Sequence, residues 1–148
     1  MKLSIIIPAR NEKETMAELL RRVRAVDVGM DKEIIVVDGS NDGTQAILER
    51  ERTNGTIVIF EERPRGKGAA IRLGLATAQG DVILFQDADL ELDPGQYPEI
   101  LAPVLSGDAQ VVFDGYGMPD SGGTVIVQWG SIQKTVVLDA DTGKASVQ

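Results

Sequence analysis

The sequence has 148 residues, which is enough for one domain with a single buried core. It contains no Cys and no His, so disulfides, thiol nucleophiles, Cys-based metal centres and histidine general bases are excluded. The net charge of −8 argues against nucleic acid as a partner, and no apolar run approaches a secretory signal or the roughly 20 residues that span a bilayer, which predicts a cytoplasmic protein.

Short β-branched runs alternate with helical patterns over the first 113 residues. The apolar runs predict five strands, at 3–7, 33–37, 56–60, 81–85 and 109–113. Apolar residues at helical spacing predict four helices, over 12–26, 44–52, 66–78 and from 94 to about 107. Gly80 is expected at the C′ position of the third helix, and Asp93 is expected to cap the fourth, with Pro94 at its first position and Gln96 in a capping box. The fourth helix is expected to bury Tyr97, Ile100, Leu101, Val104 and Leu105.

Strands that are apolar on both faces and alternate with helices predict an α/β fold. Its sheet is expected to be mostly parallel and Rossmann-like, with helices on both faces. We expect residues 1–114 to form this domain and residues 115–148 to form an atypical β-rich tail. Within the tail, 124–128 and 132–138 predict a hairpin-like unit, followed by a polar end that frays. The tail either packs on or extends the sheet, or pairs with a second copy of the chain through an exposed strand edge.

An acidic segment, FQDADLELD, follows the fourth predicted strand. Asp87 and Asp89 would point the same way if the backbone stays extended, and Glu91 would extend the row. Carboxylates this close suit a hard cation, Mg²⁺ or Mn²⁺, held jointly with substrate phosphates. The alternative is a solvated acidic loop. An EF-hand is excluded because Leu92 stands where a glycine is needed and Pro98 where the bidentate Glu belongs.

Other polar side chains follow the remaining predicted strands. Lys67 lies between two glycines at a helix start, where it can meet an anion; the alternative is a surface loop, and the segment does not match a P-loop. Asp38 is placed to accept hydrogen bonds from a nucleobase or ribose, or else belongs to a capping turn. Glu12 taken alone is a residue of a first helical turn.

Four segments in this order, SIIIPARNE, EIIVVDGSNDGT, RGKGAAIRLGLATAQGD and VILFQDADLELDP, resemble the nucleotide-sugar-binding half of family 2 glycosyltransferases. The dolichol-phosphate mannose or glucose synthase-like branch is the most similar, and the resemblance covers residues 3 to 113. It implies a truncated GT-A fold, a UDP- or GDP-linked sugar donor, Mg²⁺ or Mn²⁺, and inverting glycosyl transfer. The resemblance does not identify the acceptor, and a lipid phosphate is one possibility. A peripheral membrane location is an alternative to a purely cytoplasmic one.

The resemblance also implies site residues. Arg10 stands where the family often has an aromatic residue, and Glu91 stands where the branch often has Gln. The implied metal ligands are Asp89 and Glu91, with Asp87 assisting. No catalytic residue is assigned. The implied nucleotide-sugar-binding residues are Pro8, Ala9, Arg10, Glu12, Val36, Asp38, Lys67, Asp87, Ala88 and Asp89.

After residue 113 the sequence departs from the family pattern, without an evident acceptor-binding half. Three hypotheses follow. The first is a compact glycosyltransferase, active alone or with a partner that supplies the acceptor site. The second is a catalytically silent nucleotide-sugar-binding domain. The third is a different nucleotidyl-handling α/β enzyme that uses the same metal-binding carboxylates.

Overall fold

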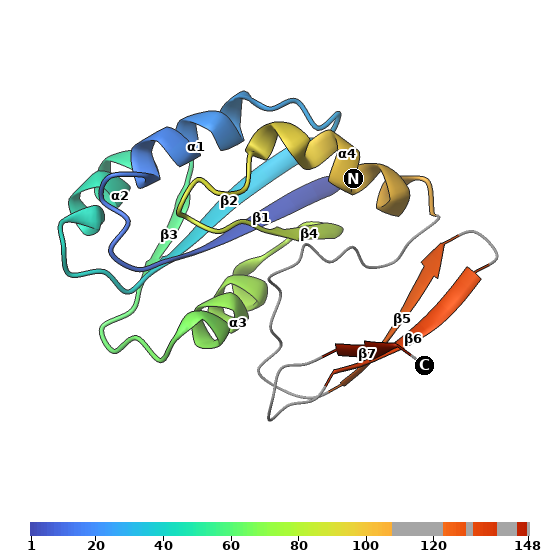
Figure 1. Cartoon of the computed structure of the whole chain (residues 1–148). Coiled ribbons are helices and arrows are strands. Elements are labelled where there is room, and N and C mark those ends of the chain that lie inside the picture. The colour runs from blue at the N-terminus through green and yellow to red at the C-terminus, as the bar shows by residue number, and fades with distance from the viewer. Residues whose placement is uncertain (108–122, 130–131, 139–144, 148) are drawn as a thin grey trace. The chain divides into compact units, whose positions relative to one another are not determined.

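The computed structural model describes residues 1–107, 123–129, 132–138 and 145–147 (Figure 1). It divides into two compact units, Met1–Gly95 and Gln96–Gln148. The predicted domain boundary after residue 114 and the predicted strand at 109–113 both lie outside the described residues.

The first unit is built on a four-stranded sheet in which all neighbouring strands are parallel. The strand order is β3-β2-β1-β4, with β1 at Lys2–Ala9, β2 at Asp31–Asp38, β3 at Ile57–Phe60 and β4 at Val82–Phe85. The helices of this unit are α1 at Met16–Ala25, α2 at Thr44–Arg52 and α3 at Lys67–Thr77. Figure 1 shows α1 and α3 on opposite sides of the sheet. The predicted α/β class with a parallel sheet is confirmed.

The core lies on both faces of β1 and β2, the two central strands. On one face, Ile6, Ile35 and Val37 form a buried cluster with Ala70 of α3. Helix α1 contributes its own buried stripe at the predicted helical spacing, made of Met16, Leu19, Leu20 and Val23. Because both faces of the central strands are covered, their sequences read as continuous apolar runs.

Helix α3 and the segment that follows it approach β1 closely because Gly74 and Gly80 have no side chain. An added Cβ at Gly74 would lie 2.4 Å from Ile6 Cγ2. The helix ends at Thr77 with Ala78 in extended conformation, and Gly80 does not have a positive φ, so the prediction of Gly80 as a C′ residue is wrong. Gly80 is required for another reason: an added Cβ would lie 2.6 Å from Ser4 N and 2.8 Å from Lys2 O of β1.

The second unit contains α4 at Tyr97–Leu105 and an antiparallel three-stranded sheet. The strands β5 at Gly123–Trp129 and β6 at Ile132–Leu138 confirm the predicted hairpin. The prediction that the polar end frays is wrong in part, because β7 at Ala145–Val147 pairs with β6.

The start of α4 also differs from the prediction. A 3-10 turn at Pro94–Gln96 precedes the helix, and Asp93 Oδ1 accepts a hydrogen bond from Gly95 N at 3.0 Å. Asp93 therefore caps the 3-10 turn, and Gln96 makes no capping-box bond. The predicted buried face is narrower than expected: Tyr97 and Leu101 are buried, Ile100 and Val104 are half-buried, and Leu105 is 39% exposed. Among the described helices, none has the length and apolar character needed to cross a membrane.

Candidate functional site

The carboxyl ends of the four parallel strands lie along one edge of the sheet. In the strand register Ala9 is opposite Asp38, Asp38 is opposite Phe60, and Ile6 is opposite Phe85. The strands β2 and β3 lie on one side of β1, and β4 lies on the other. Ligands of open α/β sheets bind at such a reversal of strand order, outside the carboxyl ends of the strands.

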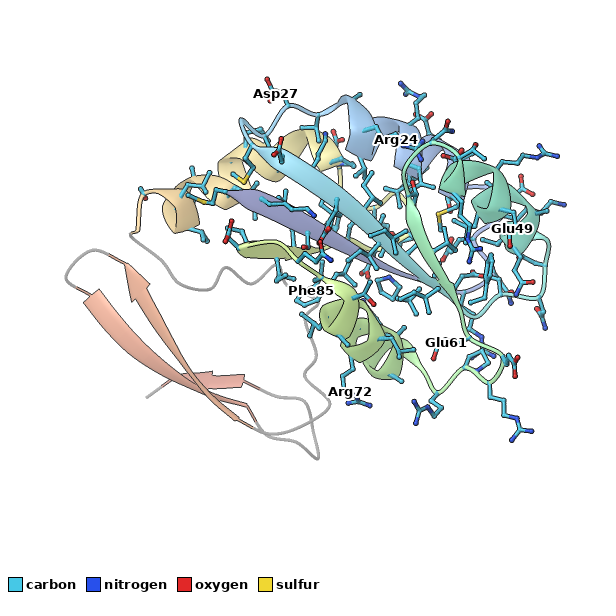
Figure 2. The ribbon with its side chains drawn as sticks, turned by 180° about the vertical axis from the view of Figure 1, so that it is seen from behind. Arg24, Asp27, Glu49, Glu61, Arg72 and Phe85 are labelled. Carbon is cyan, nitrogen blue, oxygen red and sulfur yellow. The ribbon has the colours of Figure 1, made fainter. Side chains whose placement is uncertain are left out.

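A cavity of about 330 Å³ lies at this edge, within the first unit. Most of the residues predicted to bind a nucleotide sugar line it: Pro8, Ala9, Arg10, Glu12, Lys67, Asp87, Ala88 and Asp89. The structure adds lining residues that the sequence did not single out: Gly39, Glu61, Pro64, Gly66 and Ala70. Figure 2 shows Glu61 on the loop before α3 and Phe85 at the end of β4. The four segments of the chain that carry polar motifs therefore converge on one cavity.

Val36 and Asp38 are the two predicted nucleotide-sugar-binding residues that do not line the cavity. Both are fully buried in β2. The Ser40 hydroxyl donates to Asp38 Oδ1, while Asp38 Oδ2 is buried and has no hydrogen-bond partner. Burial raises the pKa of Asp38, against the lowering effect of its hydrogen bonds with Ser40. Asp38 is thus a buried acid with one unsatisfied oxygen directly before Gly39, which does line the cavity.

Lys67 and Asp87 form an ion pair on the cavity wall. Lys67 Nζ lies 2.6 Å from Asp87 Oδ1. Lys67 is the first residue of α3, and the preceding Gly66 has a φ of 96°, a conformation that favours glycine. The helix start therefore brings a cation and free backbone amides to the same wall as the acidic segment.

The acidic segment is a turn and not an extended row. β4 ends at Phe85, and the buried side-chain amide of Gln86 donates to Asp87 O at 2.9 Å and to Leu92 O at 3.2 Å, which braces the intervening loop. Leu90 has a φ of 66°, so the backbone leaves the extended conformation. The prediction of three aligned carboxylates is therefore wrong. Glu91 is exposed, and its backbone N donates to Asp89 Oδ1 at 3.1 Å.

The two carboxylates of the acidic segment that line the cavity, Asp87 and Asp89, suit a divalent cation. Among the described residues, no three acidic side chains come together as a metal-binding group, so Glu91 does not complete one. Asp87 and Asp89 each use one oxygen in the described contacts, which leaves the other for a ligand. Mg²⁺ is commonly held by one or two carboxylates together with substrate phosphates, so this pair fits the predicted ion.

The charge of the cavity leads to the same conclusion. Its lining carries two cationic side chains, Arg10 and Lys67, and four carboxylates, which belong to Glu12, Glu61, Asp87 and Asp89. An anionic ligand would be repelled by this excess of negative charge unless a cation accompanied it.

Residues 4–135 match the family model described as glycosyl transferase family 2. One curated relative is the undecaprenyl-phosphate 4-deoxy-4-formamido-L-arabinose transferase of Pseudomonas syringae pv. syringae. It is 40% identical over 105 residues, which are 67% of this chain and 31% of that protein. The corresponding protein of Pseudomonas fluorescens is 36% identical over 111 residues, 71% of this chain and 33% of that protein. The chain thus spans about a third of the length of the curated relatives it matches.

Solved structures match the fold. The glucosyl-3-phosphoglycerate synthase of Mycobacterium tuberculosis, in complex with Mn²⁺, UDP and phosphoglyceric acid, aligns with a TM-score of 0.60 and 30% identity over 73% of this chain and 40% of that chain. The mannosyltransferase PcManGT of Pyrobaculum calidifontis, in complex with GDP-Man and Mn²⁺, aligns with a TM-score of 0.55 and 30% identity over 59% of this chain and 27% of that chain. The predicted GT-A type of fold is confirmed, and the chain belongs to glycosyltransferase family 2.

Proposed function

We propose that the cavity binds a nucleoside-diphosphate sugar and that the chain transfers the sugar, with inversion, to a lipid phosphate. The observation that carries the proposal is the convergence of Arg10, Glu12, Lys67 and the Asp87–Asp89 turn on one cavity in a family 2 chain. The names of two solved relatives include UDP and GDP-Man, and the curated relatives are named as undecaprenyl-phosphate transferases.

The cavity offers two chemically different ends for such a donor. Pro8, Ala9, Arg10 and Glu12 come from the end of β1 and its loop and would contact the nucleoside, next to the buried Val36 and Asp38. Lys67, Asp87, Ala88 and Asp89 would contact the diphosphate. Ala88 lies between the two acids and is 4% exposed, so the protein leaves little room for a larger side chain there.

Asp87 and Asp89 would hold Mg²⁺ or Mn²⁺, with Glu91 as a third ligand only if the turn changes conformation. When bound, the ion supplies charge neutralisation for the departing diphosphate, a Lewis-acid role that replaces a proton donor. The two solved relatives were crystallised with Mn²⁺. Lys67 would share in this neutralisation, since its ammonium is already on the wall where the diphosphate would bind.

A lipid-phosphate acceptor suits a chain without histidine. A phosphate oxygen forms the new bond to the anomeric carbon while the bond from that carbon to the diphosphate oxygen breaks, and the nucleoside diphosphate leaves. A phosphate monoester has a second pKa of about 6, so it is mostly a dianion at neutral pH and needs no general base. Peripheral attachment to a membrane, a cytoplasmic location and pairing of two copies stay predictions.

The second candidate is a domain that binds the donor without transferring the sugar. It is favoured by one observation: every residue that lines the described cavity belongs to the segment between Pro8 and Asp89. Incubation with radiolabelled UDP- and GDP-sugars and vesicles that contain undecaprenyl phosphate separates the two candidates. Label in the lipid fraction supports transfer, whereas nucleotide binding without labelled lipid supports the second candidate.

Donor binding is tested by calorimetric titration of UDP and GDP with and without Mn²⁺. We expect binding that needs Mn²⁺, and Asp89→Ala should weaken it by about 30-fold or more, the weight of a lost ligand to the ion. Asp27→Ala is the matched control, because Asp27 accepts a hydrogen bond from the backbone of Gly29 just as Asp89 does from Glu91. A wild-type chain that binds neither nucleotide, or an Asp89→Ala variant that binds as well as Asp27→Ala, would contradict the proposal.

A further inference from the structure

Three consecutive backbone amides of the loop after β1 are held by side chains of the loop after β2 and of Thr44, the first residue of α2. Asn11 N donates to Ser40 Oγ at 2.7 Å, and Glu12 N donates to Thr44 Oγ1 at 3.1 Å. Lys13 N donates to Asp42 Oδ2 at 3.3 Å. The accepting residues alternate along the chain, at positions 40, 42 and 44. Each of these three amides therefore has its own side-chain acceptor, in the second loop or at the start of α2.

The two hydroxyls are fixed as acceptors by neighbouring carboxylates. Ser40 Oγ donates its proton to Asp38 Oδ1, and Thr44 Oγ1 donates its proton to Asp42 Oδ1 at 2.6 Å. A hydroxyl has one proton, so each oxygen then presents only lone pairs to the amide opposite. Ser40 is 6% exposed and Thr44 is fully buried, so water does not compete for these bonds. The hydrogen bonds from Thr44 also hold the pKa of Asp42 below its ordinary value.

Groups of the first loop and of the end of β1 also accept hydrogen bonds from the backbone of the second loop. Asn11 has a φ of 60°, a left-handed conformation that Asn tolerates, and its Oδ1 accepts a hydrogen bond from Asn41 N at 3.0 Å. Gly39 N donates to Ala9 O at 3.0 Å. The two loops are thus joined from Ala9 to Lys13. Arg10 and Glu12, which line the cavity, lie within this joined segment.

The local turn before α2 does not by itself account for the arrangement. Asp42 Oδ1 also accepts a hydrogen bond from Thr44 N at 3.0 Å, which closes an Asx turn directly before α2. That bond uses the backbone of Thr44 and not its hydroxyl. The Thr44 hydroxyl accepts from Glu12 N of the first loop and donates to Asp42 Oδ1, so removing it breaks the contact between the loops and leaves the bond from Thr44 N in place.

We propose that Ser40, Asp42 and Thr44 are positioning residues that hold the backbone of residues 11–13, so that Arg10 and Glu12 are preorganised for the donor. The inference rests on the proposed function for the identity of that donor. None of the three residues lines the cavity, so they act through the first loop and not by direct contact. Preorganisation of this kind raises affinity because the loop does not have to be ordered on binding.

Thr44→Val tests the proposal because it removes the hydroxyl and keeps the shape of the side chain. We expect it to weaken binding of UDP or GDP, with Mn²⁺ present, by about 5- to 10-fold, the effect of one buried hydrogen bond. Thr44→Ser, which keeps the hydroxyl, should bind within about 2-fold of wild type. Thr77→Val is the matched control, because the Thr77 hydroxyl bonds only to Leu73 O of its own helix among the described contacts.

Amide hydrogen exchange provides a readout that does not depend on a ligand. In Thr44→Val the amides of residues 11–13 should exchange faster, while those of α2 stay as in wild type. Unchanged exchange at 11–13, or equally faster exchange throughout α2, would overturn the proposal. If the wild-type chain binds no nucleotide, the proposed function fails, and the exchange comparison still decides whether these side chains hold the loop.

Discussion

Strand β2 carries a buried acid near each end, and the two acids differ in how fully their oxygens are hydrogen-bonded. Glu33, near the start of the strand, accepts hydrogen bonds from Ser4 Oγ at 2.5 Å and Gln79 N at 2.6 Å and forms an ion pair with Lys2. Asp38, at the end of the strand, has only Ser40 at one oxygen and no partner at the other. One carboxylate is saturated with donors, and the other keeps an unused acceptor.

The pKa values of the two acids follow from these surroundings. Burial by itself would raise the pKa of Glu33, but the hydrogen bonds from Lys2, Ser4 and Gln79 outweigh it and hold the pKa below its ordinary value. Burial dominates at Asp38 and raises its pKa. A saturated buried acid stabilises the fold, whereas a buried acid with an unsatisfied oxygen costs stability. The acid at the amino end of the strand is therefore fully satisfied by the fold, and the acid with an unused oxygen lies at the carboxyl end, beside the proposed donor site.

The largest effect on stability is expected for a substitution of Gly80, which packs against the amino end of β1. Gly80→Ala would place a Cβ 2.6 Å from Ser4 N and 2.8 Å from Lys2 O, and the backbone of β1 cannot yield cheaply. We expect a loss of about 3 kcal/mol in the free energy of unfolding, measured by urea denaturation. Gly95→Ala is the control, since its added Cβ would meet the Asp93 carboxylate at 3.4 Å. Equal stability of the two variants would show that the amino end is not tightly packed.

The next effect is expected for Glu33→Gln. The change removes the negative charge that accepts hydrogen bonds from Ser4 and Gln79 and pairs with Lys2. We expect a loss of about 2 kcal/mol in the free energy of unfolding at pH 7. The loss is not larger because Lys2 is partly exposed and its ion pair is screened. The lowered pKa of Glu33 means that its contribution is present above pH 4.5 and is lost as the pH falls through the folded-state value. Glu49→Gln is the control, because Glu49 is exposed on α2 (Figure 2) and lies 3.7 Å from Arg52. A difference between the variants that does not shrink in acid would be inconsistent with this role.

The smallest effect on the free energy of unfolding is expected for Asp38→Asn, which should stabilise the fold instead of destabilising it. A raised pKa means that the folded state loses stability as the pH rises through it, since the ionised acid is buried with an unused oxygen. Removing the charge should therefore stabilise the fold by about 1 kcal/mol at pH 8, with the gain disappearing as the pH is lowered and the wild-type acid takes up its proton. Nucleotide binding should weaken in the same variant. Destabilisation similar to that of Glu33→Gln would remove the contrast between the two ends.

Much of the fold could be predicted because it depends on local patterns. Helix α2 has the predicted bounds, and β1, β2, β3 and β4 lie within a few residues of theirs, since β-branched runs and helical spacing are properties of short segments. Gly80 could not be interpreted correctly, because the atoms that exclude a side chain there belong to Lys2 and Ser4, far away in the sequence.

The residues of the candidate site also differ in whether the local sequence predicts their position. Residues that follow strands directly, such as Arg10 and Asp87, could be placed at the carboxyl edge from the strand order alone. The row of three carboxylates failed because Leu90 turns the backbone, and side-chain directions in a turn do not follow from spacing. Glu61 was missed because it comes five residues before Gly66, the glycine of the helix start, and carries no motif of its own. Its only signal was its place directly after the third predicted strand.

The close contact between Gly74 and Ile6 also has an evolutionary consequence. Since an added Cβ at Gly74 would lie 2.4 Å from Ile6 Cγ2, the sizes of these two residues are linked. A substitution to Ala at 74 becomes tolerable only when position 6 loses its Cγ2 atom, as in Ala, so homologous sequences should vary the two positions together. Such covariation would preserve the distance from α3 to β1, and with it the place of Lys67 at the far end of the helix.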